Sequence, residues 1–283
     1  MTNVRLIGPV RRWLREVRRR LRRTRHRIIS ALRGHGGVRV TVRPGWRVRV
    51  HPDGYEDLRY WLSYEAGTLA ALADVWRPGS CIVDVGAHHG SFSVCCLRAG
   101  GHGIRLLAVE PSPAAWPVLA ANLAVHAGEL CTLHRTALGD GCGTTVFYTG
   151  AANMLVSDRS LHPVTSTQPI QVPVVTLDAL CLDEGVTPDI LKIDVEGFED
   201  QVLDGASAAL AQRPVILLEW HRAMLERRGV DPMRSIRRLE EAGYQLELST
   251  EIKNGQRHVV PSRDLPSRDI LHLLCRPSVR ELG

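Results

Sequence analysis

The segment CIVDVGAHHGSFSV (residues 81–94) joins a short apolar run, a loop bounded by two glycines and a second apolar segment. The run CIVDV has the length and composition of a strand that is buried on both faces. The residues at 91–99 have the pattern of a helix. Gly86 and Gly90 carry no Cβ, so the backbone of the loop between them can approach a ligand closely. This order of strand, loop and helix is typical of the ligand-binding edge of an α/β sheet.

The alternation of strand and helix continues along the chain. Further apolar strands are predicted at 105–109, 131–138, 190–195 and 215–219. Helices are predicted at 113–127, 199–211 and 232–242. Strands at 244–249 and 269–275 would complete the sheet. Buried strands that alternate with helices indicate an α/β fold with a doubly wound, mostly parallel, Rossmann-like sheet.

The N-terminal residues differ in charge from the rest of the chain. Residues 1–33 contain twelve arginines and one acid, which gives 12 − 1 = +11; with a net charge of +6, the remainder carries 6 − 11 = −5. Apolar residues recur at helical spacing among these arginines, so a basic amphipathic arm is expected over 1–37, ending in a GHGG hinge. Such an arm suits a membrane surface or a partner protein, and an unfolded solubilising extension has the same composition. Nucleic acid is disfavoured, because the remainder shows no basic and aromatic surface.

The other 246 residues are expected to form one domain, 38–283. Residues 38–78 would form an N-terminal cap, with a β-hairpin around Pro44-Gly45 and a helix ended by Pro78-Gly79, and 79–283 the core. No apolar run approaches the ~18 residues of a membrane-spanning helix, and no apolar segment of a secretory signal follows the basic start. A cytoplasmic protein is therefore expected, with the arm as a route to the inner membrane surface. The seven cysteines include no CxxC pair, which favours buried free thiols over disulfides or zinc.

The cofactor follows from what the glycine loop contains and lacks. Glu110 follows the second strand, where a carboxylate can accept hydrogen bonds from two ribose hydroxyls, although an acid at a strand end is commonly only a cap. Gly86 is followed by Ala87-His88, so the nicotinamide loop G-x-G-x-x-G is absent. Neither lysine follows a glycine, so there is no P-loop. A nucleoside cofactor without a phosphate remains, which suits S-adenosylmethionine (SAM).

Six segments in order resemble the FkbM family of SAM-dependent methyltransferases. They are VDVGAHHGSFSV, LLAVEPSPAAWPVLAANL, TALGD, VPVVTLDAL, DILKIDVEGFEDQVLDG and PVILLEWH, within about residues 60 to 250. The string KIDVEGFE is the most specific of them. The resemblance implies the class I methyltransferase fold and SAM as cofactor. It also implies methylation of hydroxyl groups on sugars, glycolipids or macrolides.

The resemblance also implies a cofactor site. Carried over by motif, its residues are Glu65, Asp84, Gly86, Ala87, His88, Gly90, Glu110, Pro111, Thr136, Ala137 and Asp194. Glu110 would hold the ribose, Thr136 and Ala137 would lie beside the adenine, and Glu65 would close over the methionine end. The chain departs from the family at His88, where asparagine is common.

Charged residues alternate in the strand ILKIDVEGFED (190–200). Lys192, Asp194 and Glu196 would share one face, and such charges are costly to bury unless they pair or do chemistry. We expect Asp194 to contact the cofactor or the acceptor, Glu196 to position or deprotonate the acceptor, and Lys192 to balance both acids. Glu219 and His221 would complete the catalytic set, with His221 the natural base near neutral pH. The alternative is a salt-bridged strand end without a catalytic role.

The predicted activity is O-methylation of a sugar, glycolipid or glycosylated natural product. An N-methyltransferase acting on RNA or protein lacks its Asn/Asp-Pro-Pro-Tyr/Phe motif here. A non-catalytic SAM-fold binding protein is the third alternative. The acceptor pocket is expected between the hairpin and segments 149–169 and 221–232. Some other class I methyltransferases hold a divalent cation in an acid-rich site, but no ligand set in the sequence supports a metal here.

Overall fold

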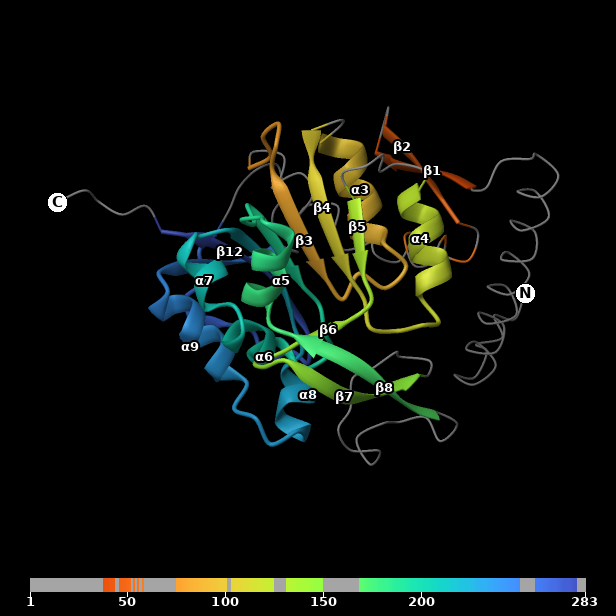
Figure 1. Ribbon diagram of the computed structural model, residues 1–283. Helices are drawn as coiled ribbons and strands as arrows, with labels where there is room; N and C mark the ends of the chain where they lie inside the picture. The colour runs from red at the N-terminus through yellow and green to blue at the C-terminus, as the bar shows by residue number, and fades with distance from the viewer. Residues whose placement is uncertain are drawn as a thin grey trace, which may run out of the picture.

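The computed structural model describes residues 38–43, 46–51, 53, 55, 58, 75–100, 103–124, 131–149, 168–249 and 258–278 (Figure 1). The basic arm and Glu65 lie outside this part of the chain. So does the helix expected before Pro78, except for residues 75 and 76, which form a turn and an irregular segment. Within the described residues, none of the helices combines the length and apolarity needed to span a bilayer.

A seven-stranded sheet forms the centre of the molecule, in the order β11-β12-β10-β9-β3-β4-β5. Its parallel strands are β3 (Cys81–Val85), β4 (Arg105–Val109), β5 (Cys131–His134), β9 (Ile190–Ile193) and β10 (Val215–Trp220). Strand β12 (Leu271–Pro277) runs antiparallel between β10 and β11 (Tyr244–Leu248). The predicted doubly wound, mostly parallel sheet is confirmed.

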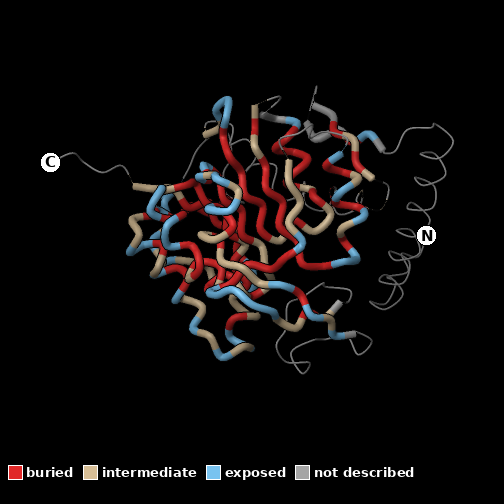
Figure 2. The backbone as a smooth tube through the Cα atoms, in the orientation of Figure 1, coloured by how far each residue is buried: buried red, intermediate tan, exposed pale blue. Residues whose placement is uncertain are grey.

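Helices cover both faces of this sheet, and the buried residues lie along its strands (Figure 2). Helices α3 (Ser91–Gly100) and α4 (Trp116–Ala124) pack on one face together with the hairpin β1 (Val38–Arg43) and β2 (Trp46–Val50). The other face carries α5 (Leu177–Glu184), α6 (Glu199–Asp204), α7 (Ser207–Ala211), α8 (Arg222–Arg227) and α9 (Met233–Glu241). The predicted hairpin is confirmed.

Two predicted elements are divided in the structure. The helix expected at 199–211 is interrupted after Asp204. Gly205, at the break, packs so closely on another segment that a Cβ there would lie 2.0 Å from the Gly139 carbonyl oxygen. The strand expected at 131–138 ends at His134, and Ala137 begins a strand of a different sheet.

That second sheet has three strands and was not predicted. It has the order β6 (Ala137–Leu138), β8 (Gln168–Val175) and β7 (Gly143–Thr149) and lies below the main sheet in Figure 1. Segment 149–169, expected as an acceptor loop, therefore begins and ends in strands, and its residues 150–167 lie outside the described part. Segment 221–232 contains the short helix α8, also not predicted.

Candidate active site

The glycine loop after β3 packs directly against the end of β9. Gly86 has a φ of 76°, and the amide N–H groups of Gly86 and Ala87 both donate to the Val109 carbonyl at 3.0 Å. A Cβ at Gly86 would lie 1.8 Å from the Asp194 carbonyl oxygen. Asp194 in turn donates its N–H to the Val85 carbonyl at 3.1 Å. The glycine loop and the acidic motif that follows β9 (Asp194 and Glu196) are therefore packed backbone to backbone at the carboxyl edge of the sheet.

Glu110 closes the other side of this loop. Its carboxylate is 4% exposed and accepts hydrogen bonds from the His88 and Ser112 N–H groups, each at 2.7 Å. Burial raises the pKa of Glu110 to about 7, although these two backbone bonds oppose the shift. Each carboxylate oxygen has a second lone pair, so the group can still accept from two ribose hydroxyls. These free acceptor positions suit ribose hydroxyls, and contact of Glu110 with the ribose of SAM stays a prediction. Pro111 beside it is buried.

His88 has a backbone conformation that is uncommon for a side-chain-bearing residue. Its φ is 47°, in the left-handed region, and this conformation accompanies the hydrogen bond from its N–H to Glu110. The imidazole stacks on that of His89, with ring centroids 4.0 Å apart. His88, at the position where asparagine is common in the family, therefore contributes to the loop in two ways: its N–H binds Glu110, and its ring stacks on His89.

Lys192 lies between two carboxylates. Its Nζ is 3.4 Å from Asp84 Oδ1, 3.1 Å from Asp194 Oδ2 and 3.4 Å from the Gly86 carbonyl oxygen. Burial alone would lower the pKa of Lys192, but the charges of Asp194 and Asp84 outweigh it and raise the pKa. Burial would raise the pKa of Asp194, but the Lys192 ammonium lowers it. The ammonium thus keeps Asp194 ionised, and its second ion pair is with Asp84, whereas the sequence predicted Glu196. A role of Lys192 in catalysis stays a prediction.

His221 lies at the centre of a group of acids. Its Nδ1 is 2.7 Å from Glu199 Oε1, and its Nε2 is 3.6 Å from one oxygen each of Glu196 and Glu219. The imidazole is 1% exposed, whereas Glu196 is 36% exposed and has a φ of 53°. Burial would lower the pKa of His221, but the hydrogen bond and the charge of Glu199 raise it to about 10. An imidazole held in this way is protonated near neutral pH.

Glu219 connects this group to the neighbouring strand. Its Oε2 lies 3.7 Å from Nδ1 of His272 on β12, the residue opposite it in the antiparallel pair. Burial, followed by the charge of Asp194, raises the pKa of Glu219 to about 7.

The sequence prediction missed His272 and the role of Glu199. Glu199 is fully buried, and besides contacting His221 it accepts a hydrogen bond from the Gly197 N–H at 2.9 Å. The signals were a histidine within the apolar strand DILHLLC and a second glutamate three residues after Glu196.

The two residues expected beside the adenine serve packing in this structure. Thr136 is buried and donates its hydroxyl to the Pro173 carbonyl at 2.9 Å. Ala137 packs with Phe147 and Val172 in the core of the three-stranded sheet. Their contact with adenine stays a prediction.

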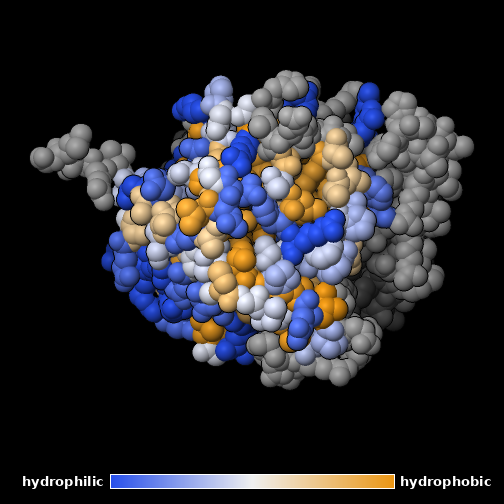
Figure 3. Space-filling view, viewed as in Figure 1, coloured by the Kyte–Doolittle hydropathy of each residue, from blue (hydrophilic) through white to orange (hydrophobic). Residues whose placement is uncertain are grey.

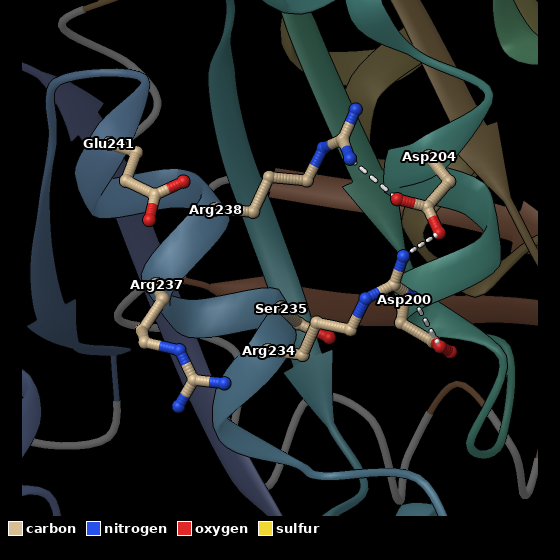
Figure 4. A pocket seen from close by; sticks show the side chains of 7 residues that line it. All are labelled: Asp200, Asp204, Arg234, Ser235, Arg237, Arg238 and Glu241. Atoms are coloured by element: carbon tan, nitrogen blue, oxygen red, sulfur yellow. Dashed lines mark hydrogen bonds and ion pairs between the residues drawn. The ribbon is translucent and has the colours of Figure 1, made fainter.

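A separate charged pocket lies between α6 and α9 (Figure 4). Its lining residues are Asp200, Asp204, Arg234, Ser235, Arg237, Arg238 and Glu241. Arg234 and Arg238 both bind Asp204, and Arg237 binds Asp231. In Figure 3 this region is among the most hydrophilic parts of the visible surface. Because these arginines are already paired with acids, we interpret the pocket as a salt-bridged contact between the two helices and not as the functional site.

The parallel sheet, the glycine loop at the carboxyl end of its first core strand and the acid after the second define a class I SAM-dependent methyltransferase. Residues 84–246, more than half of the chain, match the family described as the Methyltransferase FkbM domain. The chain belongs to the FkbM family of methyltransferases, and SAM is its methyl donor.

The chain is also similar to several methyltransferases of known name. The chain is 26% identical over 256 residues to the hexuronic acid methyltransferase AglP of Haloferax volcanii, covering 89% of this chain and 93% of AglP. A methyltransferase FkbM of Methylobacillus flagellatus is 17% identical in structure-based alignment, with a TM-score of 0.46. The alignment covers 77% of this chain and only half, 50%, of that protein. The O-methyltransferase TomG of Streptomyces achromogenes is 15% identical, with a TM-score of 0.41 and coverage of 75% and 79%.

Proposed function

We propose that this enzyme methylates a hydroxyl group of a sugar, free or within a glycolipid or glycosylated natural product. The observation that carries the proposal is the packing of the glycine loop on the backbone of Asp194, because a donor held by that loop would lie next to the carboxylates around His221. Similarity over nearly the whole length to a methyltransferase named for hexuronic acid supports a carbohydrate acceptor.

The residues divide the work between holding the donor and preparing the acceptor. Bound SAM supplies a methyl group activated by a positively charged sulfur. Glu110 and the glycine loop would hold it, while Lys192 keeps Asp194 ionised and fixed at the end of β9. Positioning of the acceptor can supply ~7–11 kcal/mol of the barrier. A positioned base adds roughly 10²–10⁴-fold in rate.

Glu196 is a better base for the acceptor hydroxyl than His221, which the sequence favoured. His221 is 1% exposed and bound through Nδ1 to Glu199, so an acceptor has little access to it. Glu196 is the most exposed of the acids next to His221, at 36%. Its positive φ of 53° is a strained conformation, which is found often at functional sites. Glu196→Gln should therefore lower kcat about 10²-fold or more while SAM still binds.

The acceptor is tested by transfer of a labelled methyl group from SAM. Matched pairs of glycosides, one with a uronic acid and one with its carboxyl reduced to an alcohol, would be incubated with the enzyme. The proposal expects label as a methyl ether on a ring hydroxyl, seen by mass spectrometry and NMR. A methyl ester on the uronic acid would refute the hydroxyl assignment, and label only on RNA or protein would refute the sugar acceptor. Contact of the N-terminal arm with a membrane surface or a partner protein stays a prediction.

A further inference from the structure

Three side chains at the carboxyl edge of the sheet have the arrangement of metal ligands. Asp194, Glu219 and His221 each offer one oxygen or nitrogen atom, and these atoms all lie within 4.8 Å of one another. They come from the ends of the adjacent parallel strands β9 and β10, which the main-sheet pairing holds in register. Glu219 lies within β10, and Asp194 and His221 are the first residues after β9 and β10, so the paired strand ends position the set.

The buried imidazole provides a second, independent indication. His221 Nδ1 is bound to Glu199, and metal-ligating histidines bind a carboxylate in this way through the nitrogen that faces away from the ion. Its Nε2 is directed between Glu196 and Glu219 at 3.6 Å from each, too far for a hydrogen bond. Two ligands that are each ~2.1 Å from one ion lie ~3 Å apart, so this spacing needs only a small contraction to hold one.

The charges around this point favour a cation. Carboxylates of Asp194, Glu196, Glu199 and Glu219 lie around it, and among the described residues the lysine paired with this group is Lys192, which binds Asp194 and also Asp84. The two histidines in contact, His221 and His272, add at most two charges. Buried carboxylates without compensation are costly, and a divalent ion would supply the missing charge.

We propose that Asp194, Glu219 and His221 bind a divalent cation, which displaces the Nε2 proton of His221 to solvent and holds the acceptor oxygen beside the methyl donor. One imidazole and two carboxylates suit Mn²⁺ better than Mg²⁺ or Ca²⁺, which prefer ligand sets made of oxygen. The cation would favour the ionised form of the acceptor hydroxyl and leave Glu196 to receive its proton. The role of the cation in the reaction rests on the proposed function, but its binding does not.

Binding of Mn²⁺ is measured on the full-length protein after treatment with a chelator, by isothermal titration and by electron paramagnetic resonance. We expect one Mn²⁺ per chain, with at least tenfold weaker binding in Glu219→Gln and His221→Gln. Glu199→Gln, which acts through the imidazole, should weaken binding about 10–100-fold. Asp231→Asn, on the exposed surface near α9, is the matched control and should bind as the wild type does.

Thermal unfolding of each variant identifies any that fail to fold, and the wild-type titration remains decisive in that case. Absence of saturable Mn²⁺ binding by the wild type at millimolar concentration would overturn the proposal. Equal binding by a folded Glu219→Gln variant would also overturn it. Methyl transfer to sugars without Mn²⁺ binding would leave the proposed function intact and remove the metal site. Mn²⁺ binding without methyl transfer to any sugar would support the metal site and refute the proposed function.

Discussion

Substitution of Gly86 by alanine tests the contact between the donor loop and the acidic motif. Two costs follow from the structure. A side chain at a φ of 76° costs roughly 1–2 kcal/mol. The new Cβ would also lie 1.8 Å from the Asp194 carbonyl oxygen, so one of the two segments must move by at least 1.2 Å to restore a contact of 3.0 Å. Displacement of a reacting group by about 1 Å can lower the rate about 10²-fold.

Gly185→Ala separates these two costs. Gly185 ends α5 with a φ of 61°, and nothing lies within 4 Å of the point that an alanine Cβ would occupy there. The Gly185→Ala variant should lose about 1–2 kcal/mol of unfolding free energy and keep the SAM affinity and kcat of the wild type. Gly86→Ala should lose more stability, bind SAM at least tenfold more weakly by isothermal titration and lower kcat about 10²-fold. Equal behaviour of the two folded variants would refute the close packing of loop and motif.

Two further predictions concern single groups. Because Glu110 has a pKa of about 7, raised by burial and by Asp84 and lowered by Lys192, it gains a proton as the pH falls from 8 to 6. SAM affinity should fall over this interval by up to about tenfold per pH unit, and in Glu110→Gln it should be weak and nearly independent of pH. Of the seven cysteines, Cys142 is exposed and five are buried, so a thiol reagent should modify one cysteine rapidly in the native protein. Rapid modification of several thiols would contradict this packing.

The sequence predicted the main sheet because its strands are buried on both faces and therefore read as apolar runs. The three-stranded sheet was missed because its longest strand, QPIQVPVV, contains Pro169 and Pro173, which argue against a central strand. Strand β6 pairs only with Val174 and Val175, which leaves most of β8 as an edge where proline is tolerated. Such limited pairing depends on tertiary structure and has no local signal.

The catalytic candidates were found because charge within an apolar strand is conspicuous. Lys192 and Asp194 do pair, and Glu196, Glu219 and His221 do gather beside them. The partners that were missed depend on distant segments. His272 faces Glu219 only through the antiparallel register of β10 and β12, about fifty residues apart in the chain. The chain reversal at Glu196 and Gly197, both with positive φ, brings Glu199 under the imidazole.

Transfer of a labelled methyl group from SAM to sugar acceptors, by the wild type and by Asp194→Asn, tests the central claim most directly. Asparagine has nearly the same size as aspartate, so the variant should fold. Because it cannot balance the Lys192 ammonium, the variant should transfer the methyl group at least about 10²-fold more slowly. A folded Asp194→Asn enzyme that methylates sugars at the rate of the wild type would show that the reaction takes place elsewhere.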